Sequence, residues 1–215
     1  MFKGVDVSRH QGIIDWDKFL EDEYSDFAII RAGFGKNNID AQAVWNVAEC
    51  ERLGIPYGLY WFSYALTPEM ARREAEYLSD FVGSHKPSYP LVYDFEYDTV
   101  THAVKNGVKI SRDFVLNCTE QFCHRLEELG YYAMFYCNND YYQRYYQASK
   151  VAEKYDMWYA RYATSPGRPV TLWQTSESGR VKGIQGKVDL DQTERDYPKI
   201  IIRNDLNNWK DALHG

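Results

Sequence analysis

The alternation of apolar and amphipathic segments constrains the fold of this 215-residue chain more than any other feature of its sequence. Short apolar runs, typical of buried strands, alternate with stretches of helical periodicity, two of which end at Gly54 and Gly130. The expected strands are residues 2–7, 27–32, 57–64, 90–96 and 131–136, and the expected helices are residues 15–23, 41–53, 67–81 and 111–129. This alternation predicts an α/β protein with a parallel sheet.

The last third of the chain consists of shorter pieces, with strands expected at residues 157–162, 171–174 and 188–190 and few good helices. Five βα units followed by three strands close best as an irregular (β/α)5(β)3 TIM-like barrel, although a complete (β/α)8 barrel usually needs about 250 residues. An open doubly wound sheet is the second choice. The sequence has no GxGxxG or Walker motif to mark the phosphate site of such a sheet.

The domain organisation is expected to be simple. A chain of this length can bury one core, so we predict a single catalytic domain over residues 1–215. The segment 196–215 contains three consecutive isoleucines and a short expected helix over residues 206–213. It either caps the bottom of the barrel or begins a linker.

The strongest local signal is the tripeptide Asp94-Phe95-Glu96 at the end of an apolar run. In a strand, side chains two residues apart face the same side and lie ~6.6 to 6.8 Å apart along the chain. Phe95 should therefore pack outward, while Asp94 and Glu96 reach the mouth of the barrel. Two neighbouring acids raise the pKa of one and leave the other ionised, as acid-assisted glycoside cleavage requires.

Two further acids at strand ends are expected to face this pair. Asp6 closes the first strand and Asp189 lies in the last, and these two strands are neighbours in a closed barrel. Asp191, two residues further on the same face, is a rival of Asp189, which we prefer because it lies nearer the strand. Asp6 could also be an ordinary turn residue, and the Asp94-Phe95-Glu96 motif could begin a loop.

Other site chemistries are less well supported by the sequence. A hard cation such as Ca²⁺ is the main alternative for a carboxylate cluster, but the five histidines and four cysteines show no metal-binding spacing. A serine nucleophile is disfavoured, because there is no GxSxG motif and Ser63 has no evident base. We predict no metal and no cofactor, and we expect the cysteines to be buried free thiols.

Aromatic residues are the second functional cue. They make up 16% of the chain and gather where strands should open onto the barrel mouth, and flat aromatic faces suit sugar rings. Alternate residues in each aromatic run must face away and pack in the core. The side chains chosen for substrate binding are Tyr64, Tyr136, Trp173, Arg161 and Trp61.

Charge and hydropathy disfavour two classes of partner. The formal net charge of −6 argues against nucleic-acid binding, which needs a basic surface. No apolar run approaches the ~20 residues that cross a membrane, and no segment typical of a signal peptide follows Met1.

Seven segments of the sequence, taken together, resemble a known family. They are Asp6-Val7-Ser8 with Gln11-Gly12, Ile30-Arg31-Ala32-Gly33, Gly58-Leu59-Tyr60-Trp61, Pro90-Leu91-Val92-Tyr93-Asp94-Phe95-Glu96, Trp158-Tyr159-Ala160-Arg161-Tyr162, Trp173-Gln174 and Val188-Asp189. In order and spacing they are similar to glycoside hydrolase family 25, the Chalaropsis-type lysozymes common among phage endolysins and bacterial autolysins. The resemblance covers roughly the first 190 residues.

This resemblance implies hydrolysis of the β-1,4 bond between N-acetylmuramic acid and N-acetylglucosamine in peptidoglycan. It implies that Glu96 is the general acid and that Asp94, Asp6 and Asp189 are the other active-site carboxylates. Asp191 departs from the pattern, because the family usually has asparagine there. We expect a monomer that binds peptidoglycan glycan strands outside the cell or at the cell wall, either released by a phage-type route or trimmed from a longer chain.

Two alternatives to a muramidase stay open at this point. A chitinase-like enzyme also carries a DxE at the end of strand four, but its DxxDxDxE pattern would need acids where this chain has Tyr89 and Val92. The other alternative is a non-catalytic barrel that binds cell-wall sugars, against which the intact Asp94 and Glu96 argue. For the mechanism, we expect the substrate's own 2-acetamido group to be the nucleophile, because Asp94 and Glu96 need not approach the ~5 to 5.5 Å typical of a carboxylate nucleophile.

Overall fold

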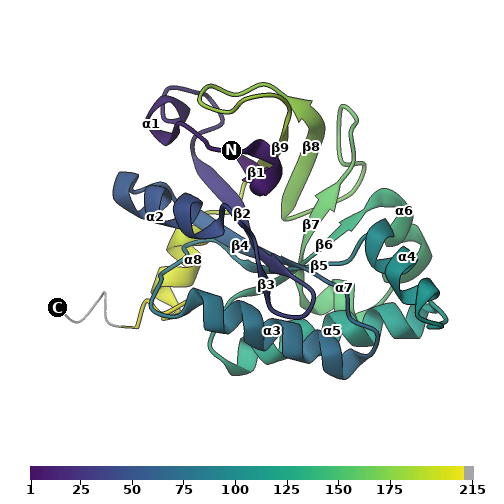
Figure 1. Cartoon of the computed structure of the whole chain (residues 1–215). Helices are drawn as coiled ribbons and strands as arrows, with labels where there is room; N and C mark the ends of the chain where they lie inside the picture. The colour runs from purple at the N-terminus through teal and green to yellow at the C-terminus, as the bar shows by residue number, and fades with distance from the viewer. Residues whose placement is uncertain (211–215) are drawn as a thin grey trace.

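The computed structural model describes residues 1–210 and contains a closed barrel of strands surrounded by helices (Figure 1). The strands are β1 (Phe2–Val7), β2 (Phe27–Phe34), β3 (Asn38–Ile39), β4 (Tyr57–Phe62), β5 (Leu91–Asp94), β6 (Ala133–Asn138), β7 (Asp156–Ala160), β8 (Leu172–Gly179) and β9 (Val188–Thr193). The α-helices are α1 (Trp16–Phe19), α2 (Ala43–Leu53), α3 (Pro68–Val82), α4 (Tyr97–Lys105), α5 (Arg112–Glu128), α6 (Asn139–Tyr141), α7 (Lys150–Lys154) and α8 (Tyr197–Arg203). A 3-10 turn, η1 (Arg9–Gln11), and a π-helical turn, η2 (Tyr142–Tyr146), complete the list.

Eight strands close the barrel in the order β1-β9-β8-β7-β6-β5-β4-β2, and pairing of β1 with β2 completes the circle. The predicted irregular (β/α)5(β)3 barrel is therefore confirmed. The expectation of a parallel sheet fails only at β9, which is antiparallel to both β8 and β1. Residues 180–187 join β8 to β9 without a helix, and so short a connection suits antiparallel neighbours, whereas the longer segment 161–171 joins the parallel pair β7 and β8. The short β3 lies outside the circle, as an antiparallel partner of β2.

Alternation along the strands divides the apolar residues into two cores. Inward-facing residues such as Tyr60, Val92 and Trp158 fill the barrel, where they meet Tyr197 and Ile201 of α8. Outward-facing residues such as Trp61 and Tyr93 pack beneath the surrounding helices. The four cysteines are buried free thiols, as expected for a chain large enough to fold without disulfides. The filled lower barrel leaves only its mouth free for a ligand.

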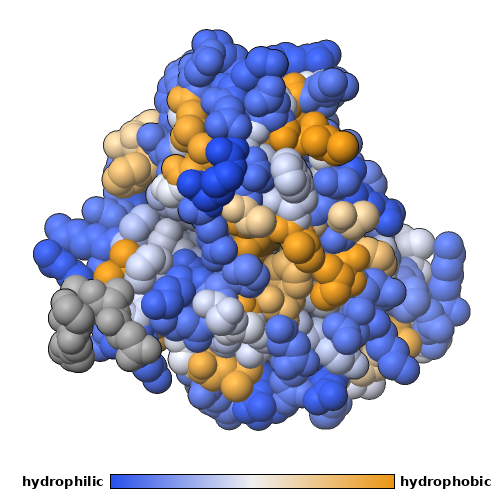
Figure 2. Space-filling model, turned by 60° about the vertical axis from the view of Figure 1, so that its left-hand side comes forward, coloured by the Kyte–Doolittle hydropathy of each residue, from blue (hydrophilic) through white to orange (hydrophobic). Residues whose placement is uncertain are grey.

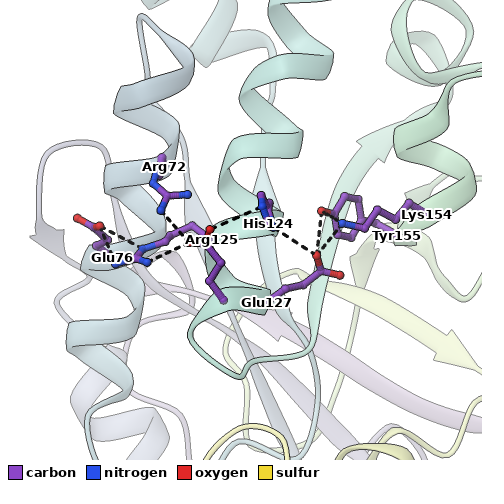
Figure 3. A network of polar contacts seen from close by, with 8 residues as sticks. Arg72, Glu76, His124, Arg125, Glu127, Lys154 and Tyr155 are labelled. Atoms are coloured by element: carbon purple, nitrogen blue, oxygen red, sulfur yellow. Dashed lines mark hydrogen bonds and ion pairs between the residues drawn. The ribbon is translucent and has the colours of Figure 1, made fainter.

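The long helices α2, α3 and α5 lie around the outside of the barrel, and β8 and β9 lie on the opposite side, at the top of Figure 1. Charged side chains connect α3, α5 and α7 at the surface (Figure 3). Arg125 Nε donates to Glu76 Oε1 across 3.1 Å, and Lys154 Nζ donates to Glu127 Oε2 across 2.7 Å. Exposed pairs of this kind are worth about 0 to 1 kcal/mol each, so the apolar core carries most of the helix packing.

Three expectations about the helices were wrong in detail. The expected helix 15–23 is the single turn α1, because Asp22 turns the chain: Asp22 Oδ1 accepts from Tyr24 N and the Asp22 carbonyl accepts from Ser25 Oγ. Between the expected strand 90–96 and the expected helix 111–129, where no helix was predicted, the structure contains α4. Thr99 Oγ1 accepts a hydrogen bond from Glu96 N and so caps its first turn.

The third difference concerns the end of the chain. A helix was expected over residues 206–213, of which 211–213 lie outside the described residues. The helix instead spans Tyr197–Arg203 as α8, and the chain leaves it through positive φ angles at Asp205, Asn207 and Asn208. Tyr197 and Ile201 of α8 pack against the apolar residues inside the barrel.

The surface is mostly hydrophilic on the face shown in Figure 2, with apolar patches interrupted by polar residues. None of the helices in residues 1–210 is long and apolar enough to span a membrane.

Candidate active site

A cleft of about 610 Å³ opens at the mouth of the barrel, where the parallel strands have their carboxyl ends. The residues that line it come from most of the barrel strands and the loops that follow them. They are Asp6, Ser8, Arg9, His10, Gln11, Arg31, Phe34, Tyr60, Phe62, Tyr64, Asp94, Glu96, Asp98, Tyr136, Trp158, Tyr162, Gln174, Glu177 and Asp189. The four carboxylates singled out in the sequence, Asp6, Asp94, Glu96 and Asp189, therefore share one cleft.

Asp94 and Glu96 reach the cleft from the same backbone segment. Asp94 is the last residue of β5, and Glu96 precedes α4 in an extended conformation, so the alternation of the strand continues through Phe95. Phe95 is buried in the outer core, and the two acids face inward. Asp94 Oδ1 is buried, and no N–H or O–H group within residues 1–210 donates to it. The Asp94 and Glu96 carboxyls lie within hydrogen-bond reach, so the two acids can share a proton until a ligand binds.

Asp6 and Asp189 lie side by side on the opposite wall, as directly paired residues of β1 and β9. Because β9 is antiparallel, Asp189 stands near its beginning and still reaches the mouth. Its rival Asp191 pairs with Gly4, two residues before Asp6 and therefore deeper in the barrel. Asp191 is fully buried, and its Oδ1 accepts from Trp158 Nε1 across 2.7 Å. Of the two, only Asp189 lines the cleft.

Burial and mutual repulsion raise the pKa of every carboxyl in this cluster. Burial, and then the charges of Asp189 and Asp98, raise the pKa of Glu96 to about 7. Burial and Glu177 raise the pKa of Asp189 to about 6. Burial and the charge of Glu96 raise the pKa of Asp94, although the Arg31 guanidinium acts in the opposite direction. At pH 5 to 6, Glu96 therefore holds a proton that it can donate.

Gln174 connects the acids to the aromatic wall. Its Nε2 donates to Asp6 Oδ2 across 2.7 Å, while its Oε1 accepts from the hydroxyls of Tyr136 (3.2 Å) and Tyr162 (3.1 Å). Tyr136 and Tyr64, both predicted to contact sugars, line the cleft. The cleft is thus lined by acids, hydroxyls and aromatic faces, a combination suited to a carbohydrate.

The structure does not bring Trp61 and Trp173 to the cleft. Both occupy outward-facing strand positions: Trp61 is fully buried with its Nε1 donating to Gly35 O, and Trp173 Nε1 donates to Arg161 O. Arg161 lines a separate hollow of about 480 Å³ that borders the cleft along Glu96 and Tyr136. In each strand the residue next to the tryptophan, such as Tyr60 or Gln174, faces the cleft instead. Both errors therefore come from assigning the wrong set of alternating strand positions to the barrel interior.

Sequence reasoning missed Arg31, a buried cation that lines the cleft and whose Nε donates to Asp40 Oδ2 across 2.7 Å. The sequence does mark Arg31 as unusual: it is the one charged residue of an otherwise apolar strand, and it lies two positions after the inward-facing Ile29. Gln174 was quoted in a motif but given no role. In residues 1–210, no group of three or more His, Cys, Asp or Glu side chains has an arrangement that could hold a metal ion.

Comparison with known proteins relates this barrel and cleft to characterised folds. YegX of Escherichia coli K12, described as uncharacterized, is 26% identical over 196 residues, which are 87% of this chain and 67% of YegX. The autolysin LytC from Streptococcus pneumoniae, solved in complex with a synthetic peptidoglycan ligand, superimposes with a TM-score of 0.78 at 26% identity. The match covers 88% of this chain and 46% of LytC, so this chain spans about half the length of that autolysin.

A bacterial lysozyme from Streptomyces coelicolor has the same fold, with a TM-score of 0.78, 22% identity and coverage of 96% of this chain and 97% of its own. Residues 5–184, which contain Asp6, Asp94 and Glu96, match the sequence profile of Glycosyl hydrolases family 25. This match spans most of the chain, and the barrel agrees with it: the protein belongs to glycosyl hydrolase family 25.

Proposed function

We propose that this protein is a muramidase, which hydrolyses the β-1,4 bond between N-acetylmuramic acid and N-acetylglucosamine in bacterial peptidoglycan. The observation that carries the proposal is the position of Glu96: a carboxyl with a raised pKa, about 7, stands at the mouth of the barrel beside Asp94. Glycoside cleavage needs an acid that still holds its proton near neutral pH, and a raised pKa meets that need.

In the proposed reaction, Glu96 protonates the glycosidic oxygen as the C–O bond breaks. The carbonyl oxygen of the substrate's 2-acetamido group attacks the anomeric carbon and forms a cyclic intermediate, which water then opens. The buried Oδ1 of Asp94 is suited to accept the acetamido N–H and so orient that group. Asp6 or Asp189, on the facing wall, would in its ionised form stabilise the positive charge that develops on the sugar ring.

Substrate and place of action follow from this reaction. The long cleft, with Tyr64 and Tyr136 on its walls, suits a polymeric glycan strand. The pneumococcal neighbour LytC was solved with a synthetic peptidoglycan ligand, which supports the same substrate class here. We place the activity at the bacterial cell wall and expect the protein to act as a monomer, without metal or cofactor.

The roles of the two acids can be separated by substitution. Glu96→Gln cannot deliver a proton, so it should bind wall fragments nearly normally and lose at least about two orders of magnitude in turnover. Asp94→Asn should also lose activity. A synthetic glycan with a nitrophenyl leaving group, which departs without protonation, should restore turnover only to Glu96→Gln. Near wild-type cleavage of walls by Glu96→Gln, or rescue of Asp94→Asn instead, would show that the roles are wrong.

A further inference from the structure

Glu74, on α3, is a buried carboxyl outside the cleft that the proposed reaction does not use. Its side chain is 3% exposed, and its two oxygens bind successive residues of the segment that follows β4. Glu74 Oε2 accepts from Ser63 Oγ across 2.6 Å, and Glu74 Oε1 accepts from Tyr64 N across 2.9 Å. Both partners are neutral donors, so these contacts do not form an ion pair.

A residue needed only for packing would not carry a carboxyl group at this position. Burial raises the pKa of Glu74 to about 7, although the hydrogen bonds from Ser63 and Tyr64 oppose the shift. Burying a carboxyl without a cation is costly, and an apolar residue of similar size would fill the space without that cost. The two bonds to the segment after β4 are therefore the property that distinguishes a carboxylate here.

The same segment is bonded to the backbone of both central acids. Ser63 N donates to the carbonyl of Asp94 across 2.8 Å. Ser63 O accepts from Thr99 Oγ1 across 2.7 Å, and Thr99 Oγ1 accepts in turn from Glu96 N across 3.1 Å. Ser63, Glu74 and Thr99 are all buried, so water cannot readily replace these bonds. A continuous path of hydrogen bonds thus joins Glu74 to the backbone that carries Glu96.

We propose that Glu74 is a positioning residue, which acts through Ser63 and Thr99 to fix Glu96 in the geometry that proton transfer requires. The same carboxylate holds the amide of Tyr64, so it also sets one wall of the cleft. This inference rests on the proposed role of Glu96 as general acid. Displacing a reacting group by about 1 Å can cost on the order of a hundredfold in rate.

The test compares the natural glycan with the nitrophenyl glycan, whose leaving group needs no proton. Glu74→Gln keeps the size of the side chain but offers only one acceptor oxygen to the two donors, Ser63 Oγ and Tyr64 N. Thr99→Val removes the last link to Glu96. Each variant should lose about tenfold to a hundredfold in kcat on the natural glycan. On the nitrophenyl glycan each should lose less than about threefold, since a misplaced acid matters little there.

Thr119→Val is the matched control, because Thr119 is a buried threonine of α5 whose hydroxyl bonds Val115 O and the Tyr146 hydroxyl, neither of which belongs to a residue that lines the cleft. Any loss from weaker folding should be equal on the two substrates. Equal losses for Glu74→Gln and Thr99→Val on both substrates, or no loss, would overturn the inference. If the nitrophenyl glycan restores turnover to Glu96→Gln, but Glu74→Gln and Thr99→Val show no selective loss on the natural glycan, only the positioning role is refuted. If the nitrophenyl glycan does not restore turnover to Glu96→Gln, the proposed function is refuted and the inference with it.

Discussion

Replacing Glu96 by glutamine should make the protein more stable at alkaline pH, even as it removes activity. The pKa of Glu96 is about 7 in the folded protein and 4.5 in its ordinary state. A raised pKa means that the folded state holds the proton more tightly, so stability falls as the pH rises from about 4.5 to about 7. At 1.36 kcal/mol per pH unit, the ionised side chain costs about 3 kcal/mol at pH 8. Its place before α4 offsets about 0.3 to 1 kcal/mol of that cost.

Glu96→Gln should therefore gain about 2 to 3 kcal/mol at pH 8 and almost nothing at pH 4.5. Thermal denaturation followed by circular dichroism should show a gain in Tm of about 4 to 12 °C at pH 8, given about 2 to 4 °C per kcal/mol for a chain of this size. Glu120→Gln, which removes an exposed carboxylate of α5, serves as the control and should change little at either pH. A gain of the same size at both pH values, or none at pH 8, would refute the reasoning.

Three further predictions follow from the site. The raised pKa values of Glu74, Glu96 and Asp189 predict that the Tm of the wild-type protein falls between about pH 5 and pH 8, and a rise in scanning calorimetry would contradict this. Participation of the acetamido group predicts that NMR detects the β anomer first, whereas a first-formed α anomer would indicate inversion by water. Trp61→Ala should cost about 3 to 5 kcal/mol in urea unfolding with KM unchanged, whereas Tyr64→Ala should mainly raise KM, and the reverse pattern would contradict their assigned places.

The barrel could be predicted from the sequence because its evidence is periodic and local. Apolar runs and helical repeats identify the βα units, and the positions of Asp6 and Asp94 at strand ends follow from the same pattern. The direction of β9 could not be predicted in this way, because it depends on the short connection over residues 180–187 and not on the residues of the strand itself. That reversal is what brings Asp189 to the mouth and leaves Asp191 deeper in the barrel.

The substrate-facing aromatic residues were harder to predict, because inward and outward positions of a barrel strand are both apolar. Trp61 and Tyr60 are adjacent and both are buried, one beneath the helices and the other inside the barrel. A polar residue in an otherwise apolar strand indicates which alternate positions face the barrel interior, as Arg31 does in β2 and Gln174 does in β8. A contact between separate segments, such as that of Glu74 with Ser63, produces no periodic pattern and cannot be predicted from a single sequence.

The most direct test of the account is the chemical identity of the new reducing ends formed when the protein digests purified Gram-positive cell walls. Turbidity should fall, and borohydride reduction followed by sugar analysis should convert muramic acid to muramitol while the glucosamine ends stay unchanged. Cell walls treated in parallel with Glu96→Gln should yield almost no muramitol. Reducing ends on glucosamine, or free peptides from an intact glycan, would contradict the proposed muramidase activity.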